Sequence, residues 1–523
     1  MVANAKSRKS RRSRSQILHK PGGVIHPRVQ AVGPQHFAIL CVDCAKNRSK
    51  TLLADFYGRV LLQPTTVEHD RPGFQAAIEQ VRDAQARHNI KDMIVVVERT
   101  GRYHRPIQHA FANAGFEVRV IHPYATKQYR QPADPGNKTD DTDLFAMHRA
   151  AVNGFGVLVH EPDPIHVQLQ LLARHRRCLV EKNVVLRQQM LERIHSYMPL
   201  YSKCFDDLFD CEAAIWIAKN LGSAAAIVQA GIDGLAQRLK TEKLPAHTPT
   251  LQKIVAWARS APPGDEPRSL HRRIFSDLDA DRLAKLRLIR AIEAELAEPL
   301  CQTPYVLLLS ICGINVVSAA EFAGEMGPIE RYPGARSISK RAGLCPSRYQ
   351  SDEVDRCDGP LVRHANHELR QATLLIAENL VRWNDHFGIL AAGWRVKKVD
   401  PRDIYVRVGG RFCRLAFQMV AGRMTFRHPC SQQIDYILTK LTRFCGDHEI
   451  APDQLLRILD VAAAQLPARD QPAEAASLAK ERDRLQAKRG PGPKALAEIL
   501  PAVLAKLGVN LIASIESGEA DPT

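Results

Sequence analysis

Apolar and polar positions follow two different periods in the first third of the chain. Runs rich in apolar and β-branched residues predict five strands, at 36–44, 51–55, 59–64, 93–98 and 117–122. Amphipathic stretches predict three helices, over 73–89, over 103–114 and from Asp140 onwards. Three strands are thus followed by helix, strand, helix, strand and helix. This order predicts an α/β domain with a mixed sheet over residues 35–158.

The middle of the chain has the longer period of helices. A long helix is predicted over 165–198, with a heptad of apolar residues at Ile165, Leu172, Leu179 and Leu186. This stripe indicates either a coiled coil or a helix packed inside its own domain. A second long helix, over 268–300, is a candidate return helix of that coil. Residues 159–300 are therefore expected to form one helical, coiled-coil region.

The remaining segments are divided by composition. Residues 1–34 are rich in Ser, Arg and Lys and predict a disordered basic arm without the apolar stretch of a secretory signal. Residues 301–430 predict a compact, mostly helical, basic domain. Residues 431–523 predict a helical extension of unknown role, with a polar linker around 467–472.

The charge balance points to a polyanionic partner. The net charge is +17, and residues 331–430 alone hold 18 Lys or Arg against 9 Asp or Glu. Nucleic acid is the leading partner that such a surplus indicates. No apolar run is long enough to predict a membrane span. The twelve cysteines lack disulfide spacing, which fits a reducing cytoplasm, and Cys41 and Cys44 are interpreted as buried small apolar residues.

Four carboxylates are placed where a site would form. Asp43 ends the first strand, Glu98 ends the fourth, and Asp140 and Asp143 lie on one face at the start of a helix. Strand ends converge at one edge of an α/β sheet, so these groups are expected to meet. Close carboxylates resist ionisation unless a cation neutralises them, and Mg²⁺ prefers oxygen ligands. The pattern predicts metal-assisted chemistry on a phosphodiester. Taken singly, each aspartate is also a common turn or helix-capping residue, Asp140 above all.

Two segments carry short motifs in a fixed order. The first contains V-E-R-T-G-R-Y, G-F-E-V-R-V-I-H-P and K-T-D-D-T-D, at 97–103, 115–123 and 138–143. The second contains L-S-I-C-G-I-N-V-V-S-A-A, R-Y, A-G-L-C-P-S-R-Y-Q-S and N-H-E-L-R, at 309–320, 331–332, 342–351 and 366–370. Over residues 36–385 the chain resembles the DEDD transposases of insertion-sequence family 110.

The resemblance implies several properties. It implies an RNase H-like, RuvC-like fold for the first domain, related to Holliday-junction resolvases. It implies that Asp43, Glu98, Asp140 and Asp143 bind Mg²⁺, and that a serine matched by Ser351 attacks DNA. It further implies a structured guide RNA that pairs with donor and target DNA, and dimers that assemble into tetramers with composite sites. The expected location is the bacterial cytoplasm, with the nucleoid.

The serine is expected on a loop between a Gly/Pro-broken stretch and a helix. A serine hydroxyl is a weak nucleophile until a base or metal activates it, and the nearest histidines in sequence are His364 and His367. Attack on DNA would give a phosphoserine link that conserves bond energy for rejoining. Most loop serines are capping or solvent residues, and Ser347 is the second candidate.

The same domain holds the candidate nucleic-acid contacts. Residues 311–320 fit a helix–hairpin–helix turn in which Gly313 allows the tight backbone and helix-start amides bind phosphate; an ordinary αα-hairpin in a core is the alternative. Candidate phosphate contacts are Arg336, Lys340, Arg341, Arg348, Arg363 and Arg370. A solvated basic face is the alternative interpretation of this set.

Three functions remain open on the sequence. The first is a DNA transposase, or recombinase, that uses the carboxylates and Ser351. The second is a hydrolytic RuvC-like endonuclease or junction resolvase that forms no covalent intermediate. The third is an inactive nucleic-acid binder, which binds DNA with a steep salt dependence and does not cleave it.

Overall fold

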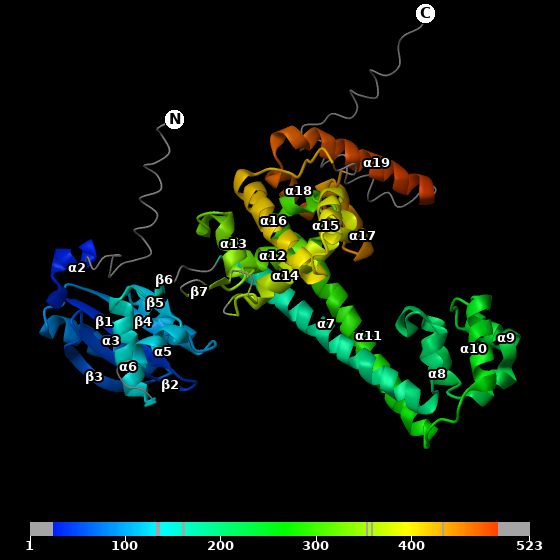
Figure 1. The fold of residues 1–523 in the computed structure, drawn as a ribbon, viewed down its shortest axis with the longest axis horizontal. Coiled ribbons are helices and arrows are strands. Elements are labelled where there is room, and N and C mark those ends of the chain that lie inside the picture. Colours follow the sequence, from blue (N-terminus) through cyan, green and yellow to red (C-terminus); the bar gives the residue numbers. More distant parts are fainter. Residues whose placement is uncertain are drawn as a thin grey trace, which may run out of the picture. The chain divides into compact units, whose positions relative to one another are not determined.

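A computed structural model describes residues 25–131, 136–158, 163–351, 354–356, 359–363, 365–430 and 434–489. The chain divides into two compact units, Met1–Glu161 and Pro162–Thr523 (Figure 1). Within the described residues, no helix is both long and apolar enough to cross a membrane.

A mixed six-stranded sheet forms the centre of the first unit. Its strand order is β3-β2-β1-β4-β5-β6. The strands are β1 Phe37–Cys44, β2 Arg48–Asp55, β3 Val60–Glu68, β4 Asp92–Glu98, β5 Val118–Ile121 and β6 Val157–Leu158. The first three strands pair antiparallel, β4 lies parallel to β1, β5 lies parallel to β4, and β6 is antiparallel to β5. This topology is the RNase H-like fold that the sequence predicts, and the fold class is confirmed.

Helices cover both faces of this sheet, because β1 and β4 are apolar on both sides. The helices are α3 Arg71–Arg87, α4 His104–Asn113, α5 Pro123–Arg130 and α6 Asp140–Val152. One apolar cluster joins β1 to α5 and α6, and a second joins the other face to α3 and α4. Cys41 belongs to the first cluster and Cys44 to the second, and both are buried. Helix α5 and strand β6 are additions to the predicted element order.

The disordered arm predicted over 1–34 is wrong for its last ten residues. Residues 27–32 form a short helix, α2 Pro27–Val32, with Val29 fully buried. The Arg28 guanidinium donates to Asp92 at 2.7 Å and to Glu117 at 2.7 Å. These contacts fix the segment against two strand ends, which a basic composition alone does not reveal. Residues 1–24 lie outside the described residues.

Two long antiparallel helices begin the second unit, as Figure 1 shows. They are α7 Pro164–Tyr197 and α11 Arg268–Cys301. Arg176 of α7 donates to Glu293 of α11 at 2.6 Å. Near the other end of the helix pair, Nη1 of Arg193 lies 3.2 Å from Nδ1 of His271. The return helix predicted over 268–300 is therefore confirmed. Leu179 and Leu186 of the heptad are buried.

A small helical cluster connects the two long helices. It comprises η2 Tyr201–Cys204, η3 Leu208–Asp210, α8 Glu212–Asn220, α9 Ala224–Thr241 and α10 Thr248–Ser260. Its apolar core is continuous with Tyr197 of α7 and Phe275 of α11, so the cluster is fixed to the end of the helix pair.

The rest of the second unit shares one large core. Its elements are η4 Pro304–Ser310, α12 Val316–Met326, η5 Ile329–Arg331, α13 Ala335–Arg341, β7 Tyr349–Ser351, β8 Val354–Arg356, α14 His367–Trp383, α15 Asp385–Val396, α16 Pro401–Gly422, α17 Ile437–Asp447, α18 Pro452–Gln465, η6 Ala468–Asp470 and α19 Gln471–Arg489. Residues 434–489 are not a separate extension, because Ile437, Leu441 and Ile458 are buried in the same core as α12 and α14. The linker predicted around 467–472 is wrong, since η6 and the start of α19 occupy it. Residues 490–523 lie outside the described part.

Candidate active site

Three elements of the first unit bring the four predicted carboxylates to one edge of the sheet. Val42 of β1 is the register partner of Val97 of β4, so Asp43 and Glu98 follow side by side at the ends of adjacent strands. Helix α6 packs on both strands and begins with Asp140. Its N-cap is Thr139, whose hydroxyl accepts from the Thr142 amide at 3.2 Å. The capping role considered for Asp140 is therefore filled by Thr139, and the Asp140 carboxylate is left for other contacts.

The four carboxylates lie close enough together for their charges to raise the pKa values of two of them. Burial and then the charges of Glu98, Asp143 and Asp140 raise the pKa of Asp43 to about 6. Burial, with the charge of Asp143 adding to it, also raises the pKa of Glu98. Lys138 opposes both shifts. The site thus holds more negative charge than its own cations neutralise.

The donor set fits a hard divalent cation by its chemistry. In the described part of the chain, however, no three His, Cys, Asp or Glu side chains are arranged as a ligand group. Arg130, at the end of α5, instead forms an ion pair with the buried Asp143. Asp141 does not belong to the set, because it is half exposed and pairs with Lys50 at 3.0 Å.

The stability of the metal-free chain tests this charge crowding. The pKa of Asp43 is raised in the folded chain, so ionised Asp43 destabilises the fold at pH values above the ordinary aspartate pKa. Asparagine at position 43 removes this carboxylate. We expect Asp43→Asn to raise the unfolding temperature at pH 8 in EDTA. The gain should vanish as the pH falls below about 4, where the unfolded aspartate is protonated as well. Thermal unfolding at pH 8 and pH 4 measures this, and no gain at pH 8 would contradict it.

Ser351 lies at the end of a short hairpin and not on a loop, which corrects the sequence expectation. It is the last residue of β7 and pairs with Val354 of β8. Its side chain is exposed. Arg348 is tied to Asp355 across the hairpin at 2.8 Å, which helps fix the strand register. His364 lies outside the described residues, and His367 begins α14.

Ser347, the second candidate, is held by its backbone. Its amide donates to the Pro360 carbonyl at 2.9 Å, and its carbonyl accepts from Gly359 at 3.2 Å. Glycine is required at position 359, because a Cβ there would lie 2.4 Å from the Ser347 hydroxyl oxygen. Both serines are exposed, and these contacts fix the backbone of Ser347.

The predicted hairpin at 311–320 joins η4 to α12. Gly313 has φ +93°, and a Cβ there would lie 2.9 Å from the Asn379 carbonyl, so glycine is required. Asn315 caps α12 by accepting from the Ser318 amide at 2.8 Å. The Lys440 ammonium donates to the carbonyls of Ile311 and Ile314 at 3.0 and 2.8 Å. A half-buried lysine from a distant helix thus holds the turn.

Two family models match the chain on either side of the helix pair. A model for DEDD-type IS110 elements, described as "Transposase", matches residues 40–199, which include all four carboxylates. A second, described as "Transposase IS116/IS110/IS902 family", matches residues 305–389, which include the hairpin and Ser351. The chain is a transposase of the IS110 family.

Other comparisons add little to this assignment. The structure titled "T. thermophilus RuvC in complex with Holliday junction substrate" is similar at 13% identity and a TM-score of 0.19, over 24% of this transposase and 100% of that chain. None of the curated proteins compared with the transposase matches it significantly. Nuclease-type domains of the DEDD class use divalent metal ions, in agreement with the donor set.

Three of the six predicted phosphate contacts of the transposase are engaged within the second unit. Arg370 donates to the carbonyls of Ala342 at 2.9 Å and Gly343 at 3.3 Å, and also to that of Val362. Arg341 donates to the Glu325 carbonyl at 3.1 Å, and Arg348 is paired with Asp355. Arg336, Lys340 and Arg363 are exposed, and none forms an ion pair with a carboxylate that the structure describes. They remain predicted contacts.

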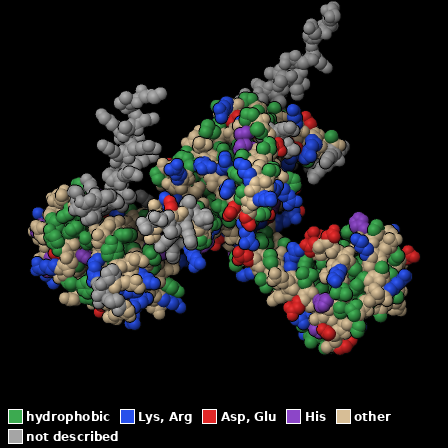
Figure 2. Space-filling model, viewed as in Figure 1, with side chains coloured by type: hydrophobic (Ala, Val, Ile, Leu, Met, Phe, Trp, Pro, Cys, Tyr) green, Lys and Arg blue, Asp and Glu red, His purple; other side chains and the backbone are tan. Residues whose placement is uncertain are grey.

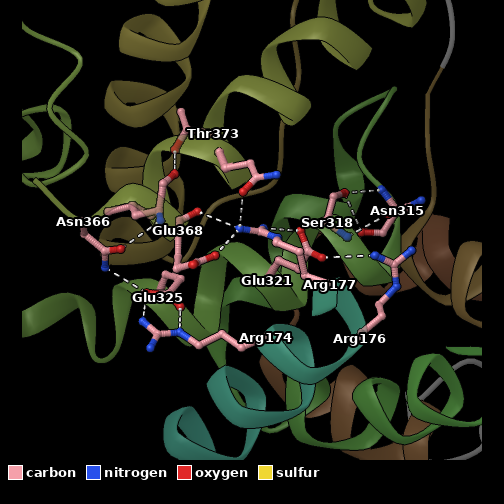
Figure 3. Close-up of polar contacts among 12 residues, drawn as sticks. Arg174, Arg176, Arg177, Asn315, Ser318, Glu321, Glu325, Asn366, Glu368 and Thr373 are labelled. Atoms are coloured by element: carbon pink, nitrogen blue, oxygen red, sulfur yellow. Dashed lines mark hydrogen bonds and ion pairs between the residues drawn. The ribbon is translucent and has the colours of Figure 1, made fainter. Parts of the chain in front are cut away.

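A buried ion-pair network, which the sequence did not reveal, joins the helix pair to the transposase core (Figure 3). Arg174, Arg176 and Arg177 of α7 point toward Glu321 and Glu325 of α12. Asn366 caps α14 and donates to Glu325 at 2.8 Å, while Glu368 accepts from Arg177 at 2.6 Å. The N-H-E-L-R motif supplies Asn366 and Glu368 to this network, and its Arg370 binds backbone carbonyls.

Proposed function

We propose that this transposase cleaves and rejoins DNA through a phosphoserine intermediate on Ser351, with Mg²⁺ held by Asp43, Glu98, Asp140 and Asp143. The observation that carries the proposal is the crowding of four carboxylates at one sheet edge, with the pKa of Asp43 raised to about 6. Such a set would hold a divalent cation, which would supply charge stabilisation for chemistry on a phosphodiester. A bound metal would polarise the scissile phosphate and stabilise the displaced oxygen.

The protein's own part begins at the Ser351 hydroxyl. Its oxygen attacks the phosphorus, the phosphorus–oxygen bond to one sugar breaks, and that sugar oxygen leaves as a hydroxyl after taking up a proton. The serine proton passes to solvent or to a neighbouring base. The reverse attack, by a sugar hydroxyl of a second DNA end, releases Ser351 and needs no external energy source. The exposure of Ser351 at the end of β7 is compatible with access by DNA.

The partners in this proposal are the element ends and target DNA, a structured guide RNA and further copies of the chain. The net charge of +17 supports a nucleic-acid partner. Dimerisation is supported by exposed apolar side chains on the helix pair, among them Leu171, Val184, Val185, Leu191, Leu283, Leu286 and Leu288. We place the reaction in the bacterial cytoplasm, at the nucleoid.

Metal removal tests the proposal. Protein co-expressed with its flanking non-coding RNA is incubated with labelled element-junction DNA and Mg²⁺, and joined and cut products are resolved on a denaturing gel. Dialysis against EDTA should abolish both products, and added Mg²⁺ should restore both. Strand joining that persists after complete metal removal would contradict the proposed role of the carboxylates.

A further inference from the structure

Seven exposed Lys or Arg side chains lie on the hairpin formed by α15 and α16, beyond the end of the family match at residue 389. Residues 395–423 contain eight Lys or Arg and only two acidic residues. The exposed cations that define this basic hairpin surface are Arg395, Lys397, Lys398, Arg402, Arg407, Arg411 and Arg414. None of them forms an ion pair with a carboxylate that the structure describes. Figure 2 shows Lys and Arg side chains gathered over this part of the unit.

The geometry of α16 concentrates these charges on one stripe. Arg407, Arg411 and Arg414 are spaced by four and three residues, so they share one helix face. Like charges at these spacings repel and destabilise the free helix, and a polyanion would relieve that repulsion. Arg407 and Arg414 are separated by roughly 10 Å along the axis, which matches the rise of about three phosphates of one DNA strand.

An aromatic ring holds two of the guanidinium groups in place. The Trp394 ring of α15 lies 5.8 Å from the Arg407 guanidinium and 5.4 Å from that of Arg411. Trp394 is partly buried and packs against the core of the unit. Its ring is therefore used to order arginines instead of being offered to unstacked bases, as single-strand binders require.

We infer that the basic hairpin surface binds the sugar–phosphate backbone of duplex DNA without reading its sequence. Arginine and lysine neutralise phosphates, and most hydrogen bonds between proteins and DNA go to phosphate and sugar. Two of the three stripe arginines are also held against the Trp394 ring, so they are less free to turn toward a base edge. The choice of DNA rests on the proposed function, whereas the polyanion surface itself rests on the exposed cations and Trp394 alone.

Salt-dependent binding tests this inference. The full chain carries Ser351→Ala and is kept metal-free, so that binding is measured independently of any phosphoserine step. Fluorescence anisotropy with a random-sequence DNA duplex is recorded between 50 and 300 mM KCl. In the triple variant R407Q/R411Q/R414Q, the slope of log affinity against log salt should become shallower by about 2 to 3. The affinity at 0.15 M salt should fall by roughly 100-fold.

Two matched variants separate this surface from a general charge effect. R407K/R411K/R414K retains the charges and should keep the slope. R238Q/K240Q/R259Q removes the same charge from exposed positions of α9 and α10 and should also keep it. The single variant R414Q should change the slope by about 0.9, which keeps the test decisive if the triple variant unfolds. Equal slope changes in both glutamine triples would overturn the inference. So would a loss confined to single-stranded RNA with duplex DNA binding unchanged.

Discussion

Asparagine at position 143 is expected to lower DNA strand cleavage by about 10³-fold or more, because it removes one charged oxygen ligand from the metal-binding set. Asp143 is almost fully buried at the start of α6, and its charge raises the pKa values of both Asp43 and Glu98. Asparagine has nearly the same shape, so the change removes charge with little change in packing. Cleavage of labelled junction DNA under single-turnover conditions measures the effect.

The neighbouring Asp141 supplies a matched control. It lies on the same helical turn but is half exposed and pairs with Lys50. Asp141→Asn should leave the cleavage rate within a few-fold of the wild type, because surface ion pairs contribute little. Thermal unfolding of both variants shows whether the loss of the Arg130 ion pair alters the fold. Equal losses of cleavage in the two variants, or less than a tenfold loss in Asp143→Asn, would exclude Asp143 from the reaction.

Glu325→Ala is expected to destabilise the second unit by about 1.5–3 kcal/mol, because it removes the charged acceptor of Asn366 and of Arg174, whose side chain is partly exposed to solvent. Glu325 is 3% exposed and accepts from Arg174 at 2.6 and 2.9 Å and from Asn366 at 2.8 Å. Its loss leaves these donors without their acceptor. Chemical denaturation of wild type and variant gives the difference in unfolding free energy. Glu368→Ala is the control, because Glu368 is 40% exposed and should cost about 1 kcal/mol or less.

The pH dependence of this difference has a definite sign. Burial alone raises the pKa of Glu325, but the hydrogen bonds from Arg174 and Asn366 outweigh burial, so the folded pKa lies below the ordinary value of 4.5. The stabilisation is therefore fully present above about pH 4.5 and is lost as the pH falls through the folded pKa. The gap between wild type and Glu325→Ala should narrow in acid. A difference in unfolding free energy between wild type and Glu325→Ala that is small at pH 7, or that grows in acid, would contradict the assigned contacts.

Strong periodic signals made the first unit predictable. The apolar runs at β1 and β4 and the heptad of α7 fix their elements, and the strand ends place Asp43 and Glu98 together. Helix α5 was missed because its sequence is mostly polar and its buried face is small. The ordering of residues 25–34 depends on Arg28 meeting Asp92 and Glu117, which are distant in sequence.

The second unit was less predictable because its polar contacts join distant residues. Lys440 fixes a turn more than 120 residues away, and Arg370 binds backbone carbonyls, a role that composition cannot distinguish from phosphate binding. The basic surface on α15 and α16 became visible only when the structure showed which arginines are already engaged. Ser351 was found through motif resemblance, since its short hairpin has no periodic signal.

The most direct test of the proposed chemistry is a covalent-trapping assay. Protein with its flanking RNA is mixed with labelled element-junction DNA and Mg²⁺, then separated under denaturing conditions. We predict a detergent-resistant protein–DNA band in the wild type and in Ser347→Ala, and no band in Ser351→Ala or Asp143→Ala. Free cut DNA without such a band, persisting in Ser351→Ala, would contradict the serine mechanism and identify the protein as a hydrolytic nuclease.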